Sequence, residues 1–379
     1  MKIAVIDTVY QGYVDQLYRD GSLIKKSWEE QYRATVEGGF PTLSSWVEPL
    51  RSRGHQVIDI WADHMPLQLR WCHDHGVQTP KDVSANSLGY VGIVAEQIRH
   101  FKPDVILSGN LYTFDSAFLH SVAGHYRIAV GQHAARLPES DFSKYDSIIS
   151  SLPNQVEFFS HHNVPSYLVK LAFDSRLLSK VDPSRKIYGV VFPGSVSADH
   201  KLRAEALLAL GREVPVDIFG SVPDYETLLG ASRSTSRLTR GFQRIKQGFA
   251  GSVATKITRH PALWGLDMYR MMGESRIVFN RHIDAAGAYA NNLRLYEATG
   301  CGALLLTDWK TNMDEIFSPG SECVTYHDTA ECLRMAKFYL QNDEKREQIA
   351  QAGRRRVIAE HTYEHRVDEL LHVIETHLH

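Results

Sequence analysis

Short apolar runs alternate with longer amphipathic stretches along the chain. In the first half the apolar runs lie at 2–10, 56–61, 104–107, 126–130, 147–150 and 166–171. The stretches between them repeat apolar residues at helical spacing and include 28–53 (with a break near Gly38), 91–101, 116–123 and 154–161. Strands that alternate with helices predict an α/β domain with a parallel, doubly wound sheet.

The same alternation resumes after a polar segment at 173–185 that contains Pro183. Apolar runs at 187–192, 214–219, 276–280 and 303–307 predict strands, whereas 331–340, 344–361 and 363–379 predict helices. Polar, proline-bearing segments are typical of domain boundaries. We therefore expect two α/β domains, at 1–175 and 186–360, followed by a closing helix at 361–379.

The stretch 280–308, NRHIDAAGAYANNLRLYEATGCGALLLTD, contains a complete βαβ unit. It predicts the end of a strand, a loop of small residues, a helix over 289–299 and a second strand. Gly300 and Gly302 favour the left-handed cap that ends many helices. The helix of such a unit begins at the carboxyl edge of the sheet, where open α/β sheets bind ligands.

The start of this helix favours binding of a phosphate. Amides at 288–291 would lack partners inside the helix and would lie at the positive end of its dipole, and Gly287 permits close approach. Asn291, Arg294 and Glu297 follow at spacings of three on one side of the helix. A cation near the phosphates and a carboxylate near ribose hydroxyls suit a nucleotide. The alternative is a surface helix with an Arg294–Glu297 pair.

Four segments of the second half carry a family resemblance. They are MYRMMGESRIVFNRH (268–282), NNLRLYEATGCGALLLTD (291–308), EIFSPGSECVTY (315–326) and AGRRRVIAEHTYEHR (352–366). In this order and spacing they resemble the C-terminal half of GT-B glycosyltransferases of the CgeB-like group, in glycosyltransferase family 1. The resemblance is close over the last third of the chain and loose over 188–220, whereas the first half matches mainly in layout.

The resemblance implies the GT-B fold, in which two Rossmann-like doubly wound parallel-sheet domains face a cleft. The first domain would bind the acceptor and the second the nucleotide-sugar donor, and the closing helix would cross back to the first. Glu297 would bind the donor ribose. The other donor contacts expected in this region are His282, Gly287, Ala288, Tyr289, Asn291, Asn292 and Arg294. Tyr289 stands where many retaining members carry a second glutamate, so the stereochemistry stays open, with retention favoured.

A turn after the strand at 187–192 adds further donor candidates. Gly194 and Ser195 form the predicted turn, and Lys201 and Arg203 follow near the start of the next helix. Similar turns with basic residues contact the donor diphosphate in GT-B enzymes, since amides and a cation offset phosphate charge. A plain turn between strand and helix, with solvated basic residues, is the alternative.

His133 is the catalytic candidate of the first half. It follows a strand on a glycine-bearing loop, where a histidine could act as a general base or bind a sugar by hydrogen bonds. The alternative is a capping or solvent-exposed histidine. Gly12 and Asn110 occupy similar positions and are acceptor-side candidates. The chain has no GxGxxG motif, which speaks against a dehydrogenase.

Composition limits the partners and the compartment. A formal net charge of −2 gives no global field that would attract nucleic acid. Four cysteines without a CxxC motif favour a reduced, cytoplasmic chain. We expect no signal peptide and no membrane span. The segment 233–259 has seven basic residues and no acidic one. It could contact an anionic acceptor or the inner face of the membrane, or form a solvated face of an insertion.

Together these observations predict a bacterial glycosyltransferase that moves a sugar from a nucleotide-diphosphate sugar to an acceptor. The acceptor would be a glycan, a lipid-linked sugar or a cell-surface polysaccharide precursor. No two aspartates occur as D-x-D, so we expect no metal and no cofactor beyond the nucleotide sugar. Two alternatives stay open. One is a catalytically silent GT-B relative that binds glycan or nucleotide, suggested by Tyr289, and the other is a nucleotide-sugar epimerase.

Overall fold

A computed structural model describes residues 1–79, 89–135, 139–196, 200–221, 255–283 and 286–378. The chain forms two compact units. Unit 1 comprises Met1–Leu177, Trp264–Leu266 and Glu360–His379, and unit 2 comprises Leu178–Leu263 and Asp267–Ala359. The short segment Trp264–Leu266 thus packs with unit 1 although the residues on both sides of it belong to unit 2, which the sequence did not predict.

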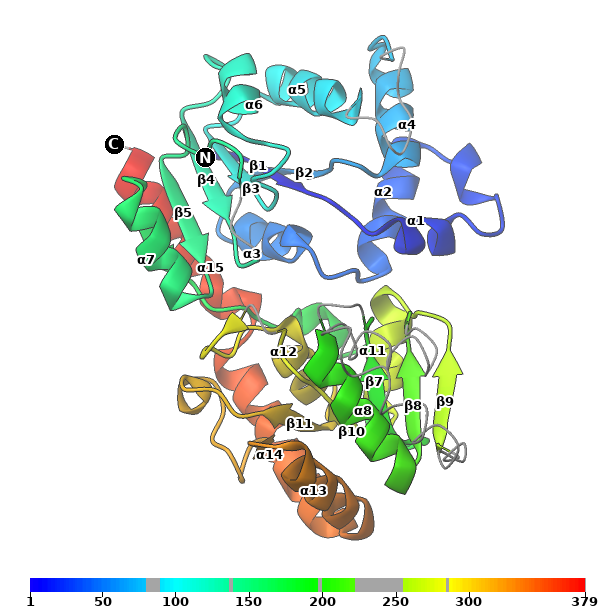
Figure 1. Ribbon diagram of the computed structural model, residues 1–379. Helices are drawn as coiled ribbons and strands as arrows, with labels where there is room; N and C mark the ends of the chain where they lie inside the picture. The colour runs from blue at the N-terminus through cyan, green and yellow to red at the C-terminus, as the bar shows by residue number, and fades with distance from the viewer. Residues whose placement is uncertain (80–88, 136–138, 197–199, 222–254, 284–285, 379) are drawn as a thin grey trace, which may run out of the picture. The chain divides into compact units, whose positions relative to one another are not determined.

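Unit 1 contains a six-stranded parallel sheet in the order β2-β1-β3-β4-β5-β6 (Figure 1). Its strands are β1 (Lys2–Asp7), β2 (Gln56–Trp61), β3 (Val105–Ser108), β4 (Ile128–Gln132), β5 (Ser147–Ser150) and β6 (Ser166–Leu168). Its helices are α1 (Gln11–Leu17), α2 (Trp28–Glu37), α3 (Val47–Ser52), α4 (Met65–His75), α5 (Gly89–Phe101), α6 (Ser116–Ser121), α7 (Pro153–His161) and α15 (Tyr363–Leu378). The strand order reverses at β1, so ligands of such a sheet are expected near the carboxyl ends of β1 and β3.

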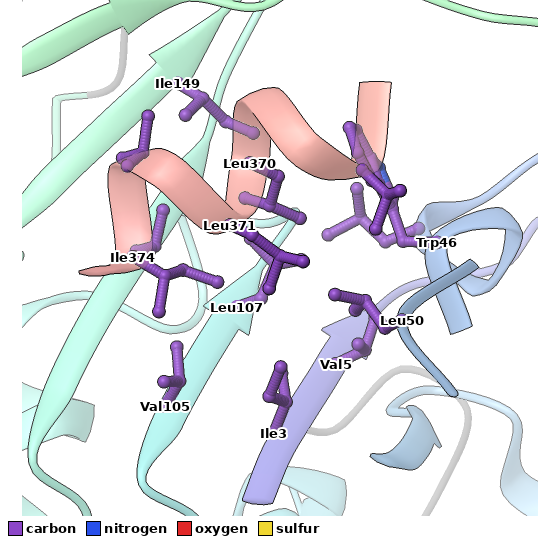
Figure 2. Packing of buried hydrophobic residues seen from close by; sticks show 14 of the residues in the cluster. Ile3, Val5, Trp46, Leu50, Val105, Leu107, Ile149, Leu370, Leu371 and Ile374 are labelled. Carbon is purple, nitrogen blue, oxygen red and sulfur yellow. The ribbon is translucent and has the colours of Figure 1, made fainter. Parts of the chain in front are cut away.

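Both faces of this sheet are buried, because alternate residues of each strand point to opposite sides. Ile3 and Val5 of β1 pack with α3 and with Leu370 and Ile374 of α15 (Figure 2). Ile6, on the other face, packs with α5, α6 and α7. The last helix of the chain therefore completes the core of unit 1.

Unit 2 contains a second six-stranded parallel sheet, in the order β12-β11-β10-β7-β8-β9. Its strands are β7 (Tyr188–Pro193), β8 (Val216–Phe219), β9 (Ile257–His260), β10 (Ser275–Phe279), β11 (Leu304–Asp308) and β12 (Val324–Tyr326). Its helices are α8 (Lys201–Glu213), α11 (Gly265–Gly273, whose first two residues count with unit 1), α12 (Leu293–Gly300), α13 (Thr329–Gln341) and α14 (Asp343–Glu360, whose last residue counts with unit 1). Helices α8 and α13 lie side by side over one face (Figure 1). The order reverses between β7 and β10, and α12 follows β10.

The prediction of two doubly wound parallel sheets is confirmed. The predicted helix at 28–53 is divided into α2, the 3-10 turn η2 (Leu43–Trp46) and α3. The predicted helix at 289–299 begins four residues late, at Leu293. Asn292 is its N-cap, and the preceding residues form turns in which Gly287 takes a positive φ of 58°. Most of the basic segment 233–259 lies outside the described residues. Among those described, no helix is long and apolar enough to cross a membrane.

Candidate functional site

The carboxyl edge of the unit 2 sheet gathers polar groups from three neighbouring strands. Pro193 ends β7, Asn280 follows β10 and Asp308 ends β11. Arg294 of α12 donates from Nη2 to the carbonyl of Pro193 at 3.0 Å. Asn292 donates from Nδ2 to Oδ1 of Asn280 at 2.9 Å. The start of α12 is thus fixed to the sheet edge through these two side chains.

Arg294 and Glu297 form a buried ion pair. Nη1 of Arg294 lies 2.8 Å from Oε2 of Glu297, and the hydroxyl of Tyr269 donates to Oε1 at 3.0 Å. Only 3% of Glu297 is exposed. The prediction that the two residues share one side of the helix is confirmed, and the alternative of a solvent-exposed surface pair is wrong. Asn291 is half-buried at the turn before the helix.

Arg203 of α8 joins two further candidate segments. Its guanidinium donates to the carbonyl of Ser195 at 3.1 Å and to that of Arg281 at 2.8 Å. It also lies over the ring of Phe192, 5.5 Å from the centroid. Arg203 is buried, so the alternative of a solvated side chain is wrong for this residue. Gly194 lies beside Ser195 in the turn after β7, and Lys201 is the first residue of α8.

His282 is held by Asp308. Oδ1 of Asp308 accepts the backbone N–H of His282 at 2.9 Å and lies 2.8 Å from its Nδ1. The imidazole is fully buried, and among the described atoms its Nε2 has no hydrogen-bond partner. Burial by itself raises the pKa of Asp308, but the hydrogen bonds and charges of His282 and Lys310 outweigh it and lower the pKa to about 2.

The structure corrects the prediction that the amides at 288–291 form a phosphate site at the start of the helix. Oδ1 of Asn292 accepts the N–H of Arg294 at 2.9 Å, so protein caps part of the first turn. The amide of Tyr289 donates to the carbonyl of Ala286, and that of Ala290 donates to Oδ1 of Asn312 at 2.6 Å. The amides at 288–291 therefore belong to a loop before the helix, because an asparagine side chain competes well for the N-cap position.

We call residues 286–290 the donor loop, after the donor contacts that the family resemblance implies for it, and the sequence did not reveal what holds it. Lys310, Thr311 and Asn312, which follow β11, bond to its carbonyls. Tyr269, the second partner of Glu297, was also missed. One signal was present in the sequence: the polar run 308–312, DWKTN, comes directly after a buried strand, at the edge where ligands bind.

The first-half candidates lie near the carboxyl edge of the unit 1 sheet. His133 follows β4 and is buried, with its ring edge-on to those of Tyr112 and Phe159. The alternative of a solvent-exposed histidine is therefore wrong for His133. Asn110 accepts the amides of Tyr112 and Thr113 through Oδ1, which stabilises its own turn. Gly12, in α1, lies against Trp264, and a Cβ atom there would come within 2.8 Å of the indole.

Asp7, which ends β1, is a carboxylate that the sequence reading missed. It accepts the amides of Thr8 and Leu43 at 2.8 Å each. Burial raises its pKa to about 6, and these two hydrogen bonds offset only part of that rise. An aspartate with a pKa near neutrality can exchange a proton under physiological conditions. Asp7 therefore joins His133 as a candidate base on unit 1.

Comparison with known proteins shows a partial family match and a shared fold. Residues 203–372 match a family model described as glycosyl transferase-like. No curated protein sequence matches the chain. Solved structures with the same two-sheet architecture are glycosyltransferases of the GT-B fold. Residues 203–372 thus resemble a glycosyl transferase-like family, and the two-sheet architecture is the GT-B fold that the sequence predicted.

Three of the similar structures illustrate the likeness. HepE (Alr3699) of Anabaena, solved with UDP and glucose, has a TM-score of 0.59 at 13% identity and covers 99% of this chain and 100% of its own. AviGT4, a glycosyltransferase involved in avilamycin A biosynthesis, has a TM-score of 0.57 at 13% sequence identity. The match covers 100% of this chain and 98% of AviGT4. Sucrose-phosphate synthase from Thermosynechococcus elongatus has a TM-score of 0.54 at 12% sequence identity. The match covers 99% of this chain and 98% of the synthase.

Proposed function

We propose that the chain transfers a glycosyl group from a uridine-diphosphate sugar to a glycan or lipid-linked acceptor, without a metal ion. The observation that supports it most directly is the buried Arg294–Glu297 pair beside the donor loop, at the edge where the unit 2 sheet reverses its order. Uridine is favoured because HepE was solved with UDP and with UDP-glucose. Retention is favoured by the family resemblance.

The positions of these residues support the following roles. Glu297 would accept from the ribose hydroxyls through lone pairs that Tyr269 and Arg294 do not use, since a carboxylate offers about four acceptor positions. The donor loop would stabilise the diphosphate as it leaves, because fixed dipoles aimed at developing charge lower the barrier. Arg203 would act indirectly, by holding the carbonyls of Ser195 and Arg281.

A binding experiment tests the donor site. Calorimetry with UDP would compare the wild-type chain with Glu297→Gln, which keeps the shape of the side chain but removes its charge. Glu213→Gln is the matched control, because Glu213 pairs with Lys337 on the exposed surface of the same unit. We expect Glu297→Gln to weaken UDP binding about tenfold or more, as for loss of a charged hydrogen bond, and Glu213→Gln to leave it unchanged. Equal UDP affinity in all three proteins would contradict the site.

A turnover experiment separates the alternatives. The chain would be incubated with UDP-sugars, with and without a panel of oligosaccharide and lipid-linked acceptors, and followed by NMR. UDP release that depends on acceptor supports transfer. Conversion of the donor sugar to its epimer without acceptor would favour the epimerase. UDP binding without any turnover would favour the catalytically silent relative, for which Tyr289 is the motivating residue.

A further inference from the structure

The segment that follows β11 contacts the donor loop through three consecutive side chains. Nζ of Lys310 donates to the carbonyl of Gly287 at 2.5 Å. Thr311 donates to the carbonyl of Ala288 twice, from its hydroxyl at 2.9 Å and from its amide at 3.0 Å. We call Lys310, Thr311 and Asn312 the brace.

Asn312 binds both backbone groups of one residue in the same loop, Ala290. Its Oδ1 accepts the N–H of Ala290 at 2.6 Å, and its Nδ2 donates to the carbonyl of Ala290 at 3.3 Å. Lys310 is in turn held 3.6 Å from Oδ2 of Asp308, the carboxylate that also binds His282. The brace is thus connected to the buried edge of the sheet.

These contacts determine how the loop backbone is oriented. Within a planar trans peptide, the carbonyl of one residue and the N–H of the next point in opposite directions. Because the carbonyl of Gly287 points to the brace, the N–H group of Ala288 points away from it, whereas the N–H of Ala290 donates to Asn312. Carbonyl dipoles that faced a bound anion would repel it, whereas N–H groups attract it.

We propose that Lys310, Thr311 and Asn312 are positioning residues that hold the donor loop so that the amide of Ala288 faces the diphosphate of the donor. This inference rests on the proposed function, since it takes the donor loop to be where the diphosphate binds. The brace binds the loop carbonyls so that the amide of Ala288 needs no reorientation when the anion arrives, and such preorganisation lowers the cost of binding. Lys310 also offsets the negative end of the Gly287 carbonyl.

The test compares a diphosphate with its nucleoside. UDP affinity would be measured by calorimetry and uridine affinity by competition, in wild type, Asn312→Ala, Thr311→Val and Trp309→Ala. Thr311→Val keeps the backbone bond to Ala288 and is the milder change. Trp309 is the matched control, because it lies in the same segment and its exposed ring packs on His327.

We expect Asn312→Ala to weaken UDP binding about tenfold and Thr311→Val to weaken it less. Uridine affinity should change less than about twofold in every variant, and Trp309→Ala should bind both ligands like wild type. A purely structural role would lower both affinities by the same factor, and that result, or unchanged UDP affinity in Asn312→Ala, would overturn the inference. A wild-type chain that bound no UDP would instead reject the proposed function, and the inference with it.

Discussion

Oδ1 of Asp308 binds two groups of His282, the backbone N–H at 2.9 Å and the ring Nδ1 at 2.8 Å. A carboxylate at the end of β11 thereby fixes the residue that leads from β10 into the donor loop. The contact aligns the imidazole and keeps Asp308 ionised down to a low pH. This relationship gives a pH-dependent contribution to stability with a definite sign.

Asp308→Asn should remove this contribution. The pKa of Asp308 is lowered from 3.8 to about 2 in the folded state, so the unfolded state binds more protons between these values. The contribution is therefore fully present above about pH 4 and is lost as the pH falls toward 2, and it amounts to about 2 kcal/mol. Urea unfolding of both proteins between pH 2.5 and 7 measures it. A stability difference that does not shrink below pH 4 would show that Asp308 is not stabilised in this way.

Glu297→Ala should destabilise unit 2 strongly, because it leaves the half-buried Arg294 without its carboxylate. Loss of one partner of a buried pair costs about 3–5 kcal/mol. Tyr269→Phe removes one hydrogen bond to the same carboxylate and should cost about 1–3 kcal/mol. Glu213→Ala, which breaks the exposed pair with Lys337, should cost less than about 1 kcal/mol. Denaturant unfolding ranks the three variants, and equal costs for Glu297→Ala and Glu213→Ala would contradict the prediction.

Lys186 should make the stability of unit 2 rise with pH in the alkaline range. Its Nζ donates to the carbonyl of Gly273, the last residue of α11, and to that of Gly302, two residues after α12 ends. Burial lowers its pKa from 10.5 to about 8, so the unfolded state binds more protons between these values. The cost of holding the charged lysine is present below pH 8 and is relieved as the pH rises toward 10.5, by roughly 3 kcal/mol.

The Lys186→Met variant provides the comparison. The free energy of unfolding of wild type relative to Lys186→Met should rise between pH 8 and 10.5, because only wild type carries the titrating ammonium. Other groups cancel in the difference between the two proteins. A difference that stayed flat or fell over this range would contradict the assignment.

Gly12→Ala should reveal the contact with Trp264. A Cβ atom at position 12 would lie 2.8 Å from the indole, and crowding of this kind costs about 1–3 kcal/mol. In a Trp264→Ala background the same change should instead stabilise unit 1 by up to about 1 kcal/mol, because Gly12 lies in α1 and alanine favours a helix. Unfolding of the four proteins in this double-mutant cycle measures the coupling. Equal effects of Gly12→Ala in both backgrounds would exclude the contact.

Much of the fold could be predicted from local pattern. The run 2–10 predicted β1, and the stretch 276–308 predicted β10, α12 and β11, with the helix ending at Gly300. The start of α12 was predicted wrongly although a signal was present, since Asn292 is a residue type that favours the N-cap. The small residues at 286–290 have no strong helical preference of their own, so that asparagine and the contacts with 310–312 determined where the helix begins.

The sequence by itself determined the alternation of strands and helices, and the segments of the second half that carry the glycosyltransferase resemblance. These follow from residue periodicity and from motifs whose members are close in the chain. Only the tertiary structure decided that Asp308 binds His282, that Lys310 binds Gly287, that Glu297 is buried with Tyr269, and that Trp264 packs with unit 1. The partners in these contacts are distant in sequence, and they meet because neighbouring parallel strands bring their carboxyl ends to one edge and because the chain returns to a unit it has left.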